Sequence, residues 1–150
     1  MSERYLSRIV VDLLLERMND TTGKKEILLL LRQNTGYYDG MYDLPGGHLE
    51  AGEDLYDAMI REAKEEIGIR IKREDLKMIH ICHRFHKGVL KFVFKAKKYE
   101  GSPTNAEPDH CKELKWVEIN NLPENIIPKI KREIESVKES EFYCKDGELE

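Results

Sequence analysis

The sequence has few of the features that mark secreted, membrane or nucleic-acid-binding proteins. Its 150 residues include only three cysteines, Cys82, Cys111 and Cys144. Their odd number and wide spacing fit neither a disulfide framework nor a zinc motif, so we expect a reducing, cytoplasmic environment. No apolar run is long enough to span a membrane, and we expect no signal peptide.

The chain also lacks a surplus of positive charge. It has 25 Lys and Arg against 29 Asp and Glu, a net charge of −4. This balance argues against an anionic membrane or a stable nucleic-acid partner. The length, with 40% hydrophobic and 36% charged residues, predicts a single domain over residues 1–150. The acidic segment 140–150 is expected to be a frayed tail.

What the chain does contain is a glycine-rich loop followed by one short helix, over residues 46–69. Asp54 suits a helix N-cap, and Asp57 stands where a capping box needs its partner. Gly68 suits the left-handed position that ends a helix. A helix of about 13 residues is therefore predicted, close to the mean length in globular proteins. Its buried stripe is Leu55, Met59, Ala63 and Ile67.

Three glutamates, Glu62, Glu65 and Glu66, lie within or beside this buried stripe. Like charges crowded at a packed face repel each other and resist desolvation, and a hard divalent cation would remove that cost. The alternative is an ordinary solvated charged face, which is common on helices. The glycines of the preceding loop favour a site, because they let the backbone approach a ligand closely.

The spacing of these residues matches a known pattern. Gly47 is followed after five residues by Glu53, and after seven more by the run from Arg61 to Ile69. This resembles the signature box of the Nudix hydrolases with every fixed position filled. Ala63 stands where a larger aliphatic residue is more usual. The resemblance implies an α+β domain, an α/β/α sandwich with a mixed, mostly antiparallel sheet.

The resemblance also implies metal-dependent hydrolysis of the pyrophosphate linkage in a nucleoside diphosphate derivative, with Mg²⁺ or Mn²⁺. Glu62 is the candidate general base, and Arg61 resembles the box arginine that pairs with Glu53 and orients the cluster. Glu53 could instead only complement the helix N-terminus. Glu107, Asp109 and Glu113 are alternative distal carboxylates, each of which could equally be an ordinary loop charge. The implied metal ligands are Gly46, through its carbonyl, and Glu62, Glu65 and Glu66.

Subfamily markers beyond the box narrow the substrate only by elimination. Residues 84–87 contain neither the proline of ADP-ribose enzymes nor the tyrosine of dinucleoside polyphosphate enzymes. A small MutT-like hydrolase acting on a nucleoside triphosphate or related diphosphate is therefore expected. The alternatives are another substrate, such as a nucleotide sugar or dinucleoside polyphosphate, and a non-catalytic nucleotide-binding module. The oligomeric state, including a homodimer, stays open.

The rest of the chain reads mainly as strands. A long strand is predicted from Tyr5 to Arg17, with Ile9, Val11, Leu13 and Leu15 on one face. It is expected to form a hairpin with a strand from Glu26 to Arg32 that is buried on both faces. Residues 90–96 alternate as a half-buried strand with Lys91 on the outer face. Further strands are predicted at residues 41–44, 76–82 and 114–119, with Trp116 in the core, and a second helix begins near Pro128.

Two other groups of residues are candidate binding residues. Tyr37 and Tyr38 lie in a loop and could stack on a nucleobase or pack on the loop itself. With Gly47, they are the predicted substrate-binding residues. His80, His83 and His86 have ligand-like spacing, but residues three apart in a strand face opposite sides. We interpret them as surface or substrate-loop histidines and not as a zinc site.

Overall fold

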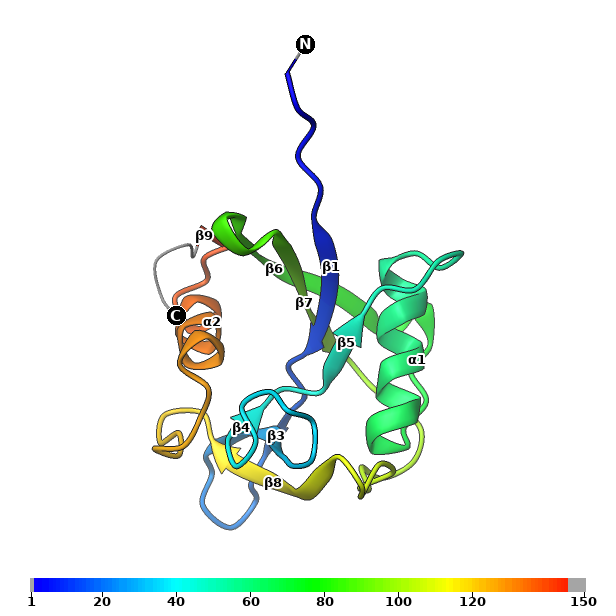
Figure 1. The fold of residues 1–150 in the computed structure, drawn as a ribbon. Coiled ribbons are helices and arrows are strands. Elements are labelled where there is room, and N and C mark those ends of the chain that lie inside the picture. The colour runs from blue at the N-terminus through cyan, green and yellow to red at the C-terminus, as the bar shows by residue number, and fades with distance from the viewer. Residues whose placement is uncertain (1, 146–150) are drawn as a thin grey trace.

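The computed structural model describes residues 2–145 and shows an α+β sandwich, as predicted. Helix α1 (Leu55–Ile67) and helix α2 (Pro128–Lys138) lie on opposite sides of the strands (Figure 1). The strands form two sheets, one mixed with five strands and one antiparallel with four. None of the helices in this described part of the chain has the length and apolar character needed to cross a membrane.

The five-stranded sheet has the order β5-β1-β7-β6-β9. Strand β1 pairs antiparallel with β5 and parallel with β7, and β6 pairs antiparallel with β7 and parallel with β9. The bounds are β1 Arg8–Leu13, β5 Gly46–His48, β6 Leu76–Arg84, β7 Val89–Ala96 and β9 Tyr143–Lys145. Short 3₁₀ turns at Arg73–Asp75 and Phe85–Lys87 precede β6 and β7.

The four-stranded sheet is built around β3 (Lys25–Arg32), whose central residues are buried, as predicted. Strands β2 (Glu16–Met18) and β4 (Tyr42–Asp43) pair with different parts of β3, and β8 (Cys111–Glu118) also pairs with it. Trp116, on β8, is partly buried against the core beneath α1. The two sheets and the two helices thus enclose two apolar clusters, one under each helix.

The single long strand predicted from Tyr5 to Arg17 is wrong. The chain leaves the five-stranded sheet after Leu13 and enters the four-stranded sheet at Glu16. Between them, Leu14 packs in the cluster under α2 and Leu15 in the cluster under α1. The hairpin with β3 is therefore made by β2 alone, because β1 pairs with β5 and β7 instead.

Helix α1 follows its sequence signals closely. Asp54 accepts a hydrogen bond from the Asp57 backbone N–H, and the Asp57 side chain accepts one from the Asp54 N–H, which completes the capping box. Gly68 ends the helix with a φ of 67°. Ala63 and Ile67 are fully buried against β1, so the apolar face fixes which side of α1 points towards the glycine loop.

The half-buried strand predicted over residues 90–96 is also wrong. Lys91 is 7% exposed and Val93 is fully buried, so both faces of β7 are covered. Helix α2 covers the second face, where its Glu133 lies 3.4 Å from Lys91 Nζ. A charged residue is buried here because a second element brings an opposite charge to it.

Two further predictions need correction. His80 is fully buried and not a surface histidine, whereas His83 is half-buried and His86 exposed. The frayed tail predicted over residues 140–150 includes β9, which pairs with β6 from Ile81 to His83. The open edge of β6 gives the backbone of β9 its hydrogen-bond partners, and this outweighs the acidic composition of the segment 140–150. Residues 146–150 lie outside the described part of the chain.

Candidate active site

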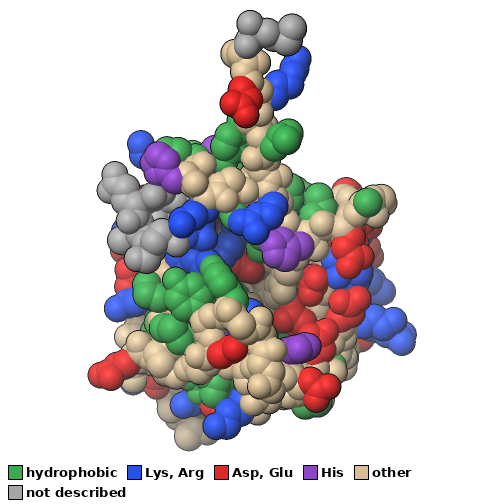
Figure 2. Space-filling view, in the orientation of Figure 1, with side chains coloured by type: hydrophobic (Ala, Val, Ile, Leu, Met, Phe, Trp, Pro, Cys, Tyr) green, Lys and Arg blue, Asp and Glu red, His purple; other side chains and the backbone are tan. Residues whose placement is uncertain are grey.

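A cavity of about 590 Å³ opens between the two sheets. It is lined by residues of the strands β1 and β3 to β8, by both helices, and by the connections 33–39 and 107–110. Figure 2 shows the hollow with basic side chains gathered on one side and acidic side chains on the other, over the region of α1. The cavity is therefore strongly polarised in charge.

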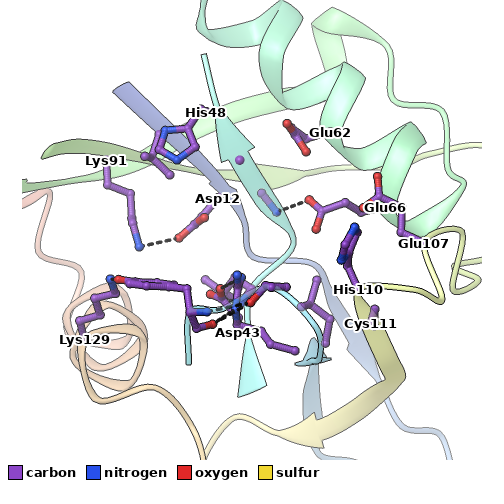
Figure 3. A pocket seen from close by; sticks show the side chains of 18 of the residues that line it. Asp12, Asp43, His48, Glu62, Glu66, Lys91, Glu107, His110, Cys111 and Lys129 are labelled. Carbon is purple, nitrogen blue, oxygen red and sulfur yellow. Dashed lines mark hydrogen bonds and ion pairs between the residues drawn. The ribbon is translucent and has the colours of Figure 1, made fainter. Parts of the chain in front are cut away.

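The acidic wall consists of Glu62 and Glu66 from α1 together with Glu107 (Figure 3). Glu62 and Glu66 are one helical turn apart, so they project from the same side of α1. Glu66 Oε1 accepts a hydrogen bond of 2.8 Å from the Gly46 N–H. That bond ties the end of α1 to β5 across the cavity wall.

The two glycines of β5 are required for different reasons. A Cβ atom at Gly46 would collide with the backbone of Val11 and with Asp12 on the neighbouring strand. A Cβ atom at Gly47 would lie closer than 3.0 Å to all three atoms of the Glu62 carboxylate group. Gly46 thus lets the strands approach each other, whereas Gly47 makes room for the Glu62 carboxylate.

Arg61 holds this wall in place. Its guanidinium donates to both carboxylate oxygens of Glu53, at 3.0 and 2.7 Å, and to Glu62 Oε1 at 2.8 Å. It also donates to the carbonyl of His48 at 3.0 Å. The predicted pair of Arg61 with Glu53 is thus present, and these bonds lower the pKa of Glu53. Arg61 reaches the glutamate cluster without lining the cavity.

Glu62 and Glu66 are costly to ionise together. Burial raises the pKa of Glu66 well above its usual value, and the adjacent Glu62 charge raises it further. Burial also raises the pKa of Glu62, although Arg61 opposes this. Two partly desolvated carboxylates at one cavity wall form a donor set that a hard divalent cation would stabilise.

The predicted metal ligands do not all lie at the cavity wall. Glu65 is exposed, and its carboxylate lies 3.3 Å from Arg61 Nη1. Over residues 2–145, no three His, Cys, Asp or Glu side chains are grouped closely enough to hold a metal ion. Glu65 and the Gly46 carbonyl stay predictions as ligands. The oxygen-rich pair of Glu62 and Glu66 fits a hard ion, with Glu107 beside it.

Of the three distal carboxylates, Glu107 is the one that lines the cavity. Its charge contributes to the raised pKa of Glu66. Glu113 instead accepts a hydrogen bond from the Tyr42 hydroxyl. Asp109 is exposed, and its backbone carbonyl accepts a hydrogen bond from Asn34. The geometry therefore favours Glu107.

The opposite wall is basic, a feature that the sequence analysis did not predict. Five cationic side chains line it, and they come from β1, β3, β6, β7 and α2, which are far apart in the sequence. No local motif could reveal this grouping. The five residues are Arg8, Arg32, Arg84, Lys91 and Lys129.

Two of these five cations, Lys91 and Arg32, also belong to a buried ion cluster at the floor of the cavity, which was not predicted. Lys91 Nζ lies 3.1 Å from Asp12 Oδ2, and Arg32 Nη1 lies 3.0 Å from Asp43 Oδ2 (Figure 3). Burial raises the pKa of Asp12 to about 7, against the opposing charge of Lys91. Burial, followed by the Asp12 charge, raises the pKa of Asp43 to about 6.

The two tyrosines have different positions. Tyr37 lines the cavity, is 46% exposed and lies beneath the Lys129 ammonium at 4.6 Å from the ring centroid. Tyr38 is half-buried and packs against the cluster under α2. Tyr37 can therefore meet a ligand directly, whereas Tyr38 supports it through an edge-to-face contact at 4.8 Å.

Comparison with known proteins identifies the family. A family model described as the NUDIX domain matches residues 7–137, which include every element from β1 to most of α2. The chain belongs to the Nudix family. This confirms the resemblance that the box from Gly47 to Ile69 indicated.

Several Nudix relatives have named activities. The chain is 33% identical over 117 residues to an ADP-ribose pyrophosphatase of Methanocaldococcus jannaschii, covering 77% of this chain and 64% of that protein. It is 47% identical over 100 residues to the NAD-capped RNA hydrolase NudC of Vibrio parahaemolyticus, covering 67% of this chain and 37% of that protein. The chain thus spans less than two thirds of either relative.

The fold is shared with solved Nudix structures. A MutT NUDIX hydrolase from Burkholderia pseudomallei matches with a TM-score of 0.73 at 25% identity, covering 87% of this chain and 98% of that one. The architecture of this chain, with its glycine-bearing β5 leading into α1, is therefore that of a small Nudix domain.

Proposed function

We propose that this chain hydrolyses the pyrophosphate linkage of a nucleoside triphosphate or a related nucleoside diphosphate derivative, with Mg²⁺ or Mn²⁺ as its cofactor. The observation that carries the proposal is the pair of partly buried glutamates, Glu62 and Glu66, facing a basic wall across one cavity. A polyphosphate needs positive charge around it, and a chain with a net charge of −4 must supply it locally.

We assign the cation to the carboxylates of Glu62 and Glu66, with Glu107 beside them on the same wall. Glu65 and the Gly46 carbonyl are further predicted ligands. A bound divalent ion supplies charge neutralisation at phosphate oxygens and acidifies water. Hydrolysis forms a bond between a water oxygen and phosphorus and breaks a bridging P–O bond, and one water proton must be accepted. We assign that general-base role to Glu62, because burial raises the pKa of its carboxylate and so makes it a stronger proton acceptor.

The remaining roles follow from position. Arg61 and Glu53 orient Glu62 and do not touch the phosphates. Lys129 and Arg8 line the basic wall, where they would pair with phosphate oxygens. Tyr37 offers an exposed ring for nucleobase stacking, with Tyr38 behind it. Gly47 leaves the space that Glu62 occupies.

The proposal is tested by a substrate panel read by phosphate or pyrophosphate release, with Mg²⁺ and with a chelator. The panel covers canonical and oxidised nucleoside triphosphates, nucleotide sugars, dinucleoside polyphosphates and ADP-ribose. We expect metal-dependent turnover of at least one class. Glu66→Gln should reduce kcat/KM by about 100-fold or more, on the order of 3 kcal/mol of transition-state stabilisation.

The matched control is Glu135→Gln, which removes an exposed glutamate of α2 and should leave turnover unchanged. Equal activity in wild type and Glu66→Gln would refute the assignment of the glutamate pair. Tight nucleotide binding without turnover of any substrate would favour the non-catalytic binding module. We further propose a cytoplasmic location, in keeping with the three reduced cysteines.

A further inference from the structure

Two cysteines that are 62 positions apart meet at one edge of the five-stranded sheet. Cys82 lies on β6 and Cys144 on β9, and their sulfur atoms are 3.0 Å apart. Both are reduced thiols in the structure. The imidazole of His80 is beside them, with Nε2 3.3 Å from Cys144 Sγ and Nδ1 2.8 Å from the Glu141 carbonyl oxygen.

The strand register places the two cysteines in the geometry that a disulfide needs. Cys82 and Cys144 are direct partners in the parallel pairing of β6 with β9. Neighbouring strands are about 4.8 Å apart, and disulfides join Cα atoms that are roughly 4.4 to 6.8 Å apart. Registered partners also point to the same face of a sheet. A bond between the sulfurs therefore needs side-chain rotation and no movement of either strand.

The two thiols differ in accessibility. Cys82 is 6% exposed, whereas Cys144 is partly exposed. The hydrogen bond with Cys144, followed by burial, raises the pKa of Cys82. Cys144 is therefore the thiol that a small reagent in solution meets first, and Cys82 lies behind it as the resolving partner.

We propose that Cys82 and Cys144 are an oxidisable dithiol, a modification site that closes to an intrachain disulfide by exchange with a small disulfide such as oxidised glutathione. The Cys144 thiolate attacks one sulfur of glutathione disulfide and releases one glutathione thiolate. The Cys82 thiolate then attacks Cys144 Sγ in the mixed disulfide and releases the second. The protein loses two electrons and two protons, and two molecules of glutathione are formed.

The bond would fasten the short strand β9, and with it the end of α2, to the centre of the domain. Strand β9 pairs through only three residues, from Tyr143 to Lys145. Strand β6 pairs along its other edge with β7, where Cys82 is the direct partner of Lys91. The side chain of Lys91 lines the cavity. Disulfides in a reducing compartment are mostly transient or redox-sensing, so a site of this kind is compatible with a cytoplasmic location.

The third cysteine is an internal control. Cys111 is on β8, is 5% exposed, and its Sγ lies 3.2 Å from the Glu113 carbonyl oxygen. With only three cysteines in the sequence, a bond between Cys82 and Cys144 leaves Cys111 without a thiol partner in the same chain. Cys111→Ser should therefore leave the oxidation unchanged.

The test compares wild type, Cys144→Ser and Cys111→Ser after incubation with oxidised glutathione and, separately, with dithiothreitol. Free thiols are counted in denaturant, and linked peptides are mapped by mass spectrometry under non-reducing conditions. We expect oxidised wild type to fall from three thiols to one, with residues 82 and 144 in one linked peptide. Its Tm should exceed that of the reduced form by about 5 °C or more, because a loop of this length is closed in the unfolded chain.

Cys111→Ser should gain the same linkage and the same Tm shift, and Cys144→Ser should gain neither. A stable glutathione adduct on Cys144, a bond between two chains, or a linkage that includes Cys111 would each overturn the proposal. If Cys144→Ser does not fold, the wild-type peptide map decides the question alone. The readouts do not use hydrolysis, so the result is independent of the proposed function.

Discussion

At the scale of single residues, the site depends on two neighbouring glycines that meet different obstacles. Gly46 faces backbone atoms of β1, which cannot move without disturbing the sheet, whereas Gly47 faces the end of the Glu62 side chain. The same substitution should therefore have different effects at the two positions. Substitution of Gly46 should mainly lower the stability of the fold, whereas substitution of Gly47 should mainly lower the activity.

We predict that Gly47→Ala displaces the Glu62 carboxylate and lowers kcat by about 10-fold to 100-fold, because small misplacements of a catalytic group are costly. Its Tm should change little. Gly46→Ala should instead lower the free energy of unfolding by about 1–3 kcal/mol or more, since the overlap is with backbone. Steady-state kinetics and urea unfolding of both variants separate the effects, and the reverse pattern would contradict this account.

The buried ion pair on the cavity floor gives a second prediction at this scale. Lys91→Met would leave Asp12 and Glu133 buried without their shared cation. We expect a loss of about 3–5 kcal/mol in the free energy of unfolding. Lys97→Met, an exposed lysine just after the same strand, should stay within about 0.5 kcal/mol. Equal losses of unfolding free energy in Lys91→Met and Lys97→Met would show that the buried ion pair does not contribute to stability.

Asp12 also predicts a pH dependence. Burial raises the pKa of Asp12 in the folded chain to about 7, so the folded state holds a proton that the unfolded state has released. The stability that this proton provides is present at low pH and is lost as pH rises towards 7. The free energy of unfolding should therefore fall by about 2 kcal/mol from pH 5 to pH 7 through this group.

Unfolding of wild type and Asp12→Asn in urea at several pH values checks this prediction. The free energy of unfolding of wild type should fall relative to that of Asp12→Asn as pH rises, because asparagine does not titrate. A difference that stays constant between pH 5 and pH 7 would contradict the raised pKa of Asp12.

At the scale of elements, α1 is the rigid support of the acidic wall, and its ends are fixed by local sequence. Gly68 adopts a φ of 67°, and a Cβ atom there would also lie 2.9 Å from Thr104 Oγ1. We predict that Gly68→Ala lowers the free energy of unfolding by about 1 kcal/mol or more. Gly68→Asn should cost less, because asparagine tolerates the left-handed region better. Thermal unfolding ranks the three proteins, and equal Tm values would contradict the prediction.

At the scale of the whole molecule, what the sequence could predict depended on how local each signal was. The caps of α1 and the pair of Arg61 with Glu53 are set by residues within a few turns, and both are present. The change of sheet at Leu14 could not be predicted, because a continuous apolar run does not show which sheet each residue joins. Lys91 was misplaced for a related reason, since Glu133 of α2, which covers β7, is 42 positions away in the sequence.

The same reasoning applies to the site. Glu62 and Glu66 lie on one helix and their grouping was predicted, whereas Glu107 was one of three alternatives and Glu65 is exposed. The basic wall comes from five separate elements and was not predicted. The meeting of Cys82 with Cys144 was missed because β9 lies in a segment whose composition indicated a tail. Long-range pairing of this kind leaves no periodic pattern in the sequence.

The most direct test of the central claim is a crystal structure with Mn²⁺ and a non-hydrolysable nucleoside triphosphate analogue. Anomalous scattering would locate the ion without reference to the protein chemistry. We predict a Mn²⁺ peak bound by the carboxylates of Glu62 and Glu66, with the triphosphate between them and the basic wall. An ion bound elsewhere, with both carboxylates left in contact only with solvent, would contradict the claim.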